Sequence, residues 1–148
     1  MHPILKKMNY KNQAEIWVIK APAEFEETMK EIADEVTIME DLKAGSKIHF
    51  VLVFAYEKAD VGPFVKELLP QLEEDAVVWF AYPKKTSNQY NSDLTRDTGW
   101  QPLGDAGFEG VRQVAIWSAL RFRHVDNIKT LTRNKKLAMT EQGMKREI

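Results

Sequence analysis

The sequence predicts a single α/β domain with a Rossmann-like, three-layer architecture, in which helices cover a mostly parallel sheet that ends in an antiparallel strand or hairpin. The hydrophobic pattern alternates between strand-like and helix-like periods along the chain. Two apolar runs, residues 47–56 and 75–83, are continuous enough for strands buried on both faces. The 148 residues, 44% of them hydrophobic, suffice for the core of one domain.

The first half of the chain predicts three strands and one helix. Residues 16–20 form a short buried strand that Pro22 ends. The apolar side chains of the following helix recur every three or four residues: Phe25, Met29, Ile32 and Val36. Residues 37–41 predict a short strand, and Gly45 with Ser46 predicts a turn. The run 47–56, which includes His49 as an interior residue, is expected at the centre of the sheet.

The middle of the chain predicts a second helix and the next buried strand. Asp60 is a candidate N-cap, and Pro70 ends or kinks the last turn. The inner face of this helix is expected to carry Val61, Phe64, Val65, Leu68 and Leu72. After the strand 75–83, a third helix within residues 93–106 is interrupted by Gly99 and Pro102.

The segment 110–125 predicts β structure, but its pattern leaves one long strand and a tight hairpin open, because no residue in its middle favours a turn. One parity of this segment is apolar: Val114, Ile116, Leu120 and Phe122. The other parity is polar: Gln113, Arg121 and Arg123. Residues 1–125 are therefore expected to form the domain. Residues 126–148 are expected to form a basic extension, docked around Ile128 and Leu131 and mobile beyond them.

Composition excludes several classes of function. The net charge of −1 provides no overall basic field, which argues against nucleic acid as a partner. The absence of cysteine excludes disulfides, thiolate metal sites and cysteine nucleophiles. No signal-peptide core and no membrane-spanning apolar run is visible, so we expect a cytoplasmic protein with no membrane partner. A small anionic ligand, a protein partner and a homo-oligomer all stay open.

The search for catalytic and cofactor motifs is negative. The three histidines, His2, His49 and His124, lack the spacing of metal ligands. There is no P-loop, and Pro22 and several acids stand where a glycine-rich dinucleotide loop would follow the first strand. Ser87 and Ser118 lack the sequence context of a hydrolase nucleophile. The sequence therefore predicts no metal and no cofactor, identifies no catalytic residue, and leaves open whether the protein is an enzyme.

Polar residues follow the strand 75–83 directly, and ligands of open α/β sheets bind at the carboxyl ends of such strands. The predicted anion-binding residues are Tyr82, Lys84, Lys85, Thr86, Ser87 and Arg96. Their ammonium, hydroxyl and guanidinium groups suit a phosphate or carboxylate. The alternative is that the hydroxyls cap the next helix, the lysines are solvated, and Arg96 pairs with Asp93 or Asp97.

A second candidate cluster contains two arginines on one strand face and nearby tryptophans: Trp100, Trp117, Arg121 and Arg123. Arginine beside an aromatic ring suits a nucleobase or a phosphate. The alternative is that the arginines protect an edge strand from pairing and Trp117 anchors the core.

Four motifs resemble an uncharacterised bacterial family, a domain of unknown function: WxxYPKxTS, RDxxW, GxxxVRxVAI and WSALRFR. The resemblance covers about residues 16–123 and implies no established activity. The residues that match the pattern are Trp79, Tyr82, Pro83, Lys84, Thr86, Ser87, Arg96, Asp97, Trp100, Arg112, Trp117, Ser118, Arg121 and Arg123. The family carries a short acidic turn between the positions of Ile116 and Trp117, which are adjacent here; it implies a hairpin whose turn is shortened.

The order of elements is similar, at the level of fold only, to the second half of class I S-adenosylmethionine-dependent methyltransferases, without their glycine-rich loop. The leading hypothesis is a non-enzymatic binding or regulatory module that holds an anionic small molecule or partner at loop 82–87. The alternatives are a methyltransferase-related enzyme with a degenerate or atypical cofactor site, and a structural protein that forms oligomers.

Overall fold

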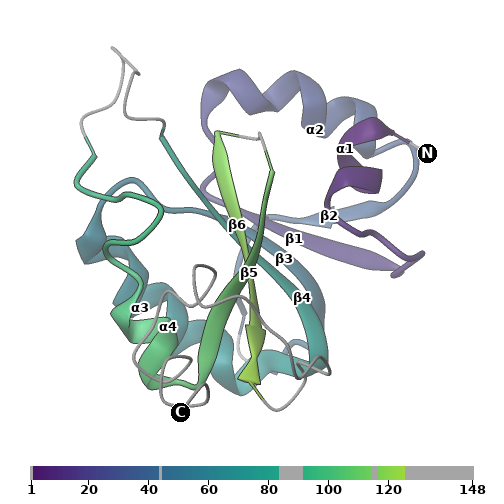
Figure 1. The fold of residues 1–148 in the computed structure, drawn as a ribbon. Coiled ribbons are helices and arrows are strands. Elements are labelled where there is room, and N and C mark those ends of the chain that lie inside the picture. The colour runs from purple at the N-terminus through teal and green to yellow at the C-terminus, as the bar shows by residue number, and fades with distance from the viewer. Residues whose placement is uncertain (1, 44, 84–91, 115–116, 126–148) are drawn as a thin grey trace.

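The computed structural model describes residues 2–43, 45–83, 92–114 and 117–125. The predicted extension 126–148 lies outside the described residues, as do Lys84, Lys85, Thr86 and Ser87. In the described part, helices lie on both faces of a six-stranded sheet, which confirms the predicted three-layer α/β fold (Figure 1). None of the described helices is long and apolar enough to cross a lipid bilayer.

The sheet is parallel except for one strand. In chain order the strands are β1 (Glu15–Ile19), β2 (Thr37–Met39), β3 (Ile48–Phe54), β4 (Leu72–Tyr82), β5 (Phe108–Val114) and β6 (Ser118–His124). Their order in space is β2-β1-β3-β4-β6-β5. Strands β1 to β4 pair in parallel, whereas β6 lies antiparallel between β4 and β5. The carboxyl ends of the first four strands therefore meet along one edge.

Two pairs of helices cover the two faces of the sheet. The helices are α1 (Pro3–Lys7), α2 (Glu26–Ile32), α3 (Lys58–Leu68) and α4 (Gln101–Asp105). Figure 1 shows α1 and α2 on one face and α3 and α4 on the other. On the α1/α2 face, Leu5 and Ile32 pack against strand residues that include Trp79. On the α3/α4 face, Val61 and Leu103 pack against the opposite parity of the same strands.

The central strand β3 is buried as its sequence predicts, with one exception. Every residue of β3 is buried except His49, which is exposed. The pairing of β3 with β4 is irregular between Ile48 and Phe50, so the side chain between them does not enter either core. The prediction that His49 is an interior histidine was wrong.

The boundaries of α3 differ from the prediction at both ends. The helix begins at Lys58 with Glu57 as its N-cap, and Asp60 is its third residue rather than its cap. At the other end, a 3₁₀ turn that contains Pro70 leads directly into β4. Leu72 is therefore the first residue of a strand, not part of the inner face of the helix.

The segment 110–125, for which one strand and a hairpin were both open, contains two antiparallel strands, β5 and β6. Trp117, the residue before β6, has a φ of 54°, a left-handed conformation found in turns. Val114 pairs with Ala119 and packs on the α1/α2 face, whereas Leu120 and Phe122 pack on the α3/α4 face. Val114 has the same sequence parity as Leu120 and Phe122, but it lies on the other face because the chain reverses between them.

Candidate functional site

Tyr82 lies at the carboxyl end of β4, where the sequence predicts an anion site. Its cross-strand partner is Ser118, and its ring contacts Trp100 with a centroid separation of 5.7 Å. Burial raises the pKa of the Tyr82 phenol; Ser118 and the positive charge of Arg96 oppose this shift, and Asp97 adds to it. The structure therefore brings Tyr82, Ser118 and Arg96 within electrostatic reach of one another.

Arg96 lies in the segment that precedes α4. Its Nη1 atom is 3.9 Å from the Oδ1 atom of Asp97, at the outer limit of an ion pair. Both side chains are exposed, at 39% and 71% of their surface, so water screens this pair. This agrees with one part of the alternative to an anion site, which is that Arg96 pairs with Asp93 or Asp97. Four of the predicted ligands, Lys84 to Ser87, lie outside the described residues.

The N-terminus of α3 also lies at this edge, but carboxylates of the chain itself already occupy it. The backbone N–H of Lys58 donates to the Oδ1 atom of Asp93 over 2.7 Å. The N–H groups of Tyr56 and Glu57 both donate to Oδ2 of Asp60. A helix N-terminus attracts anions through such donors. Here those donors are satisfied, so α3 offers little to an anionic ligand.

The topological switch point of the sheet lies between β1 and β3, because the chain leaves these two strands on opposite faces. Ligands of open α/β sheets bind in the crevice at this point. Here the Tyr56 hydroxyl, just after β3, donates to the carbonyl oxygen of Lys20, just after β1, over 2.9 Å. Trp117 packs edge-on against the Tyr56 ring at 5.2 Å. These contacts bridge the carboxyl ends of β1 and β3 at the switch point.

The second predicted cluster does not form as a unit. Trp100 is 1% exposed and packs against Phe80 and Phe122 on the α3/α4 face. Its indole N–H donates to the carbonyl of Thr95. Arg121 pairs with Trp79, a residue of the opposite face. Trp100 is thus a core residue that the sheet separates from the arginines.

The other members of that cluster lie along β6. Trp117 packs against Phe54 and Tyr56 at the start of the strand, which supports its alternative role as a core anchor. Arg121 lies four residues further on, about 13 Å along an extended chain. Arg123 donates to Asp75 over 2.8 Å. Arg123 therefore pairs with a carboxylate, and in the described part of the chain the rings of Trp100 and Trp117 do not stack on the arginines.

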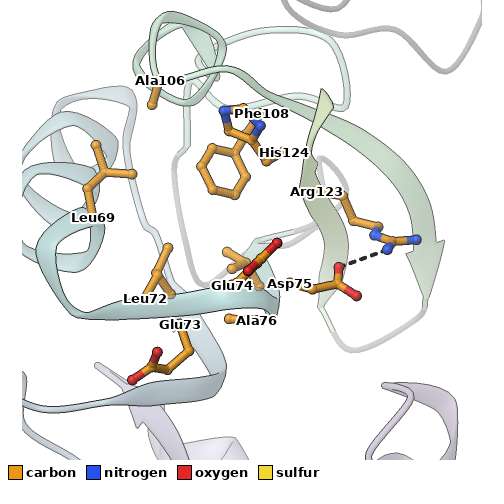
Figure 2. A pocket seen from close by; sticks show the side chains of 11 residues that line it. Leu69, Leu72, Glu73, Glu74, Asp75, Ala76, Ala106, Phe108, Arg123 and His124 are labelled. Atoms are coloured by element: carbon orange, nitrogen blue, oxygen red, sulfur yellow. Dashed lines mark hydrogen bonds and ion pairs between the residues drawn. The ribbon is translucent and has the colours of Figure 1, made fainter. Parts of the chain in front are cut away.

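A cavity of about 360 Å³, which the sequence does not predict, lies at the opposite end of the sheet from Tyr82. Figure 2 shows Phe108 and His124 over its interior, with Leu69 and Leu72 on the facing side. The remaining residues that line it are Glu73, Glu74, Asp75, Ala76, Val78, Ala106 and Arg123. Strand β4 and the end of β6 form it together, so no local sequence pattern predicts it.

Comparison with solved structures supports the fold, and comparison with protein sequences gives no match. No protein-family model matches the chain, and no curated protein matches it in sequence. Among solved structures, the chain is similar to a ribosomal protein L11 methylase from Lactobacillus delbrueckii subsp. bulgaricus, with a TM-score of 0.51 and 12% sequence identity. The match covers 82% of this chain and 76% of the other.

The chain has a methyltransferase-like fold. This confirms the fold-level similarity that the order of elements indicates. At 12% identity the match supports no transfer of activity. The resemblance to the uncharacterised bacterial family stays a prediction, because no family model matches.

Proposed function

We propose that this chain is a binding protein that holds a small anionic ligand at the carboxyl end of β4. Tyr82 and Ser118 would donate hydrogen bonds through their hydroxyls, and Arg96 would supply the positive charge. The observation that carries the proposal is the environment of Tyr82: a buried phenol at the carboxyl end of β4, on which the charge of Arg96 acts. A neutral phenol is a hydrogen-bond donor, which an anion requires.

Two further features support binding rather than catalysis. Tyr82 and Ser118 are cross-strand partners, and among the described residues no histidine or carboxylate forms a hydrogen bond with either hydroxyl. A nucleophilic serine needs such a base within hydrogen-bond reach. Lys84, Lys85, Thr86 and Ser87, which follow β4 in the sequence and lie outside the described residues, are proposed as further ligands.

The test uses the tyrosine rings as local reporters. The full chain, labelled with ¹³C on its four tyrosine rings, is titrated with inorganic phosphate at constant ionic strength. We expect a saturable shift of the Tyr82 signal, which the Tyr82→Phe variant assigns by its absence. Tyr10, whose hydroxyl donates to Gln13 in a distant loop, is the internal control and keeps its position.

Arg96→Gln makes the same experiment quantitative. Loss of one charge-assisted hydrogen bond weakens binding by about tenfold or more, so the titration midpoint moves up by that factor. Lys66→Gln removes an exposed charge from α3 and is the matched control, with no change expected. A Tyr82 signal that does not move, or that moves equally in Arg96→Gln, would contradict the proposal.

A second candidate function, a methyltransferase-related enzyme, is favoured by one observation, the structural similarity to a ribosomal protein L11 methylase. Such an enzyme would bind S-adenosylmethionine in the crevice at the switch point. The Tyr56–Lys20 hydrogen bond would first have to open. Failure to bind S-adenosylmethionine at millimolar concentration would exclude this candidate.

A further inference from the structure

Two arginines face each other directly across the β5–β6 hairpin. Arg112 of β5 and Arg121 of β6 are cross-strand partners, next to an irregularity of the ladder between Gly110 and Arg112. Side chains of directly opposed residues leave the sheet on the same face, with Cα atoms about 4.5–5.5 Å apart. Like charges in this position destabilise a sheet. The arrangement therefore calls for an explanation other than stability.

Protection of an edge strand does not explain Arg121. Strand β5 is the edge of the described sheet, but β6 lies inside it, between β4 and β5. A strand that is paired on both sides needs no charge to prevent further pairing. Arg112 alone would serve that purpose on the edge strand.

A nearby carboxylate pairs with the neighbouring arginine, Arg123, instead. Figure 2 shows Arg123 pointing away from Phe108 and His124 and toward Asp75, to which it donates over 2.8 Å. Glu109, which is fully buried, is the cross-strand partner of Arg123. Asp75 is therefore the acid that forms an ion pair with Arg123. Among the described residues, neither Arg112 nor Arg121 has a carboxylate within ion-pair distance.

One buried donor of Arg121 lacks a hydrogen-bond partner among the described residues. This donor is its Nε–H group. Burial lowers the pKa of its guanidinium, and the charges of Arg123 and Arg112 lower it further against the opposing effect of Asp75. An arginine stays charged in spite of such shifts. A buried donor on a charged group is costly unless a ligand satisfies it.

We propose that Arg112 and Arg121 form a second anion site that binds a phosphate group, free or as part of a phosphate ester. Two guanidinium forks from adjacent strands can each donate to the oxygens of one tetrahedral dianion. The dianion offsets the repulsion between the two arginines and gives the Nε–H of Arg121 an acceptor. Arg123, already paired with Asp75, holds the strand end in place.

This site is separate from the one proposed at Tyr82. Tyr82 packs on the α3/α4 face, and Arg121 lies on the opposite face, three residues along β6 from Ser118, the partner of Tyr82. The two proposals can therefore fail independently. The Arg96→Gln background, which weakens the first site, is used throughout the test.

The experiment follows the Nε–H signals of ¹⁵N-labelled arginine in the full-length chain during titration with inorganic phosphate at constant ionic strength. We expect a saturable shift at Arg121. Arg112→Gln, a change at an exposed side chain that leaves the fold intact, should raise the midpoint about tenfold or more. Arg112→Lys keeps the charge but loses the planar guanidinium group. Its titration midpoint should therefore lie between the midpoint with Arg112 intact and that of Arg112→Gln.

Lys30→Gln on the exposed side of α2 is the control and should leave the midpoint unchanged. An Arg121 signal that does not saturate, or that saturates equally in Arg112→Gln, would overturn the proposal. A parallel titration with a short single-stranded DNA identifies the source of the phosphate. Tighter binding of the DNA, falling steeply with salt, assigns the site to a nucleic-acid backbone. Phosphate binding without that gain assigns it to a small phosphate compound.

Discussion

The Tyr56 hydroxyl joins the ends of two parallel strands that the chain leaves on opposite faces of the sheet. Its partner Lys20 has a φ of 59°, which a residue with a side chain adopts at some cost. Glycine would adopt this conformation freely and leave room for a ligand. In this chain the position is a lysine, Lys20, and its carbonyl oxygen accepts the hydrogen bond from Tyr56. Tyr56 and Lys20 thus bridge the strand ends at the switch point of the sheet.

Two tyrosines predict how the protein responds to alkali. Burial raises the pKa of Tyr56 and of Tyr82 above the ordinary value of 10.0. Near that value both phenols ionise in the unfolded chain but resist ionisation in the folded one. Their contribution to the free energy of unfolding is therefore fully present below pH 10 and is lost as the pH rises through the raised values.

Urea denaturation from about pH 9 upward measures this loss. The free energy of unfolding of the wild type should fall more steeply above about pH 10 than that of Tyr82→Phe, which lacks one of the two phenols. Parallel curves for the two proteins would show that burial of Tyr82 does not oppose its ionisation.

At the scale of elements, α1 shows how tertiary packing makes a helix of five residues. A helix this short does not form alone in water. Leu5 is fully buried, and Met8 accepts a hydrogen bond from the buried indole of Trp79 over 3.0 Å. The sequence predicts no element here, because five residues are too few to show a hydrophobic period. The anchors of α1 lie more than 70 residues away on β4.

Leu5→Ala tests whether α1 belongs to the core. Removal of a fully buried leucine side chain should lower the free energy of unfolding by about 2–5 kcal/mol. Lys7→Ala, an exposed change in the same helix, is the matched control and should stay within about 0.5 kcal/mol. Urea denaturation of both variants measures the difference. Equal effects would show that α1 is not docked as the structure has it.

The strands were predictable where the sequence has a continuous apolar run, but not where the chain turns or the strand pairing is irregular. The apolar runs of β3 and β4 require burial on both faces, and the structure has them there. The hairpin turn was not predictable, because Trp117 takes a left-handed conformation that sequence assigns to glycine or asparagine. The exposure of His49 depends on an irregular pairing with another strand, which no local pattern reveals.

At the scale of the whole molecule, the sequence predicts the layers and the mostly parallel sheet, but only part of the site. Tyr82 and Arg96 are close because α4 and its preceding segment fold back onto β4, near where the sequence places them. The Tyr56–Lys20 hydrogen bond and the arginine pair are different. They join residues 36 positions apart, or opposed across a hairpin, so only the assembled sheet brings them together.

The central claim is that this α/β fold, in which Tyr56 bonds to Lys20 across the switch point, binds an anion at the carboxyl end of β4. The most direct measurement is a pair of amide-shift titrations of the ¹⁵N-labelled full-length chain, one with S-adenosylhomocysteine and one with inorganic phosphate. The account predicts that phosphate produces saturable shifts at Tyr82 and Arg96, while S-adenosylhomocysteine leaves Lys20 and Tyr56 unmoved. Saturable shifts at Lys20 and Tyr56 with S-adenosylhomocysteine, and none at Tyr82 with phosphate, would contradict it.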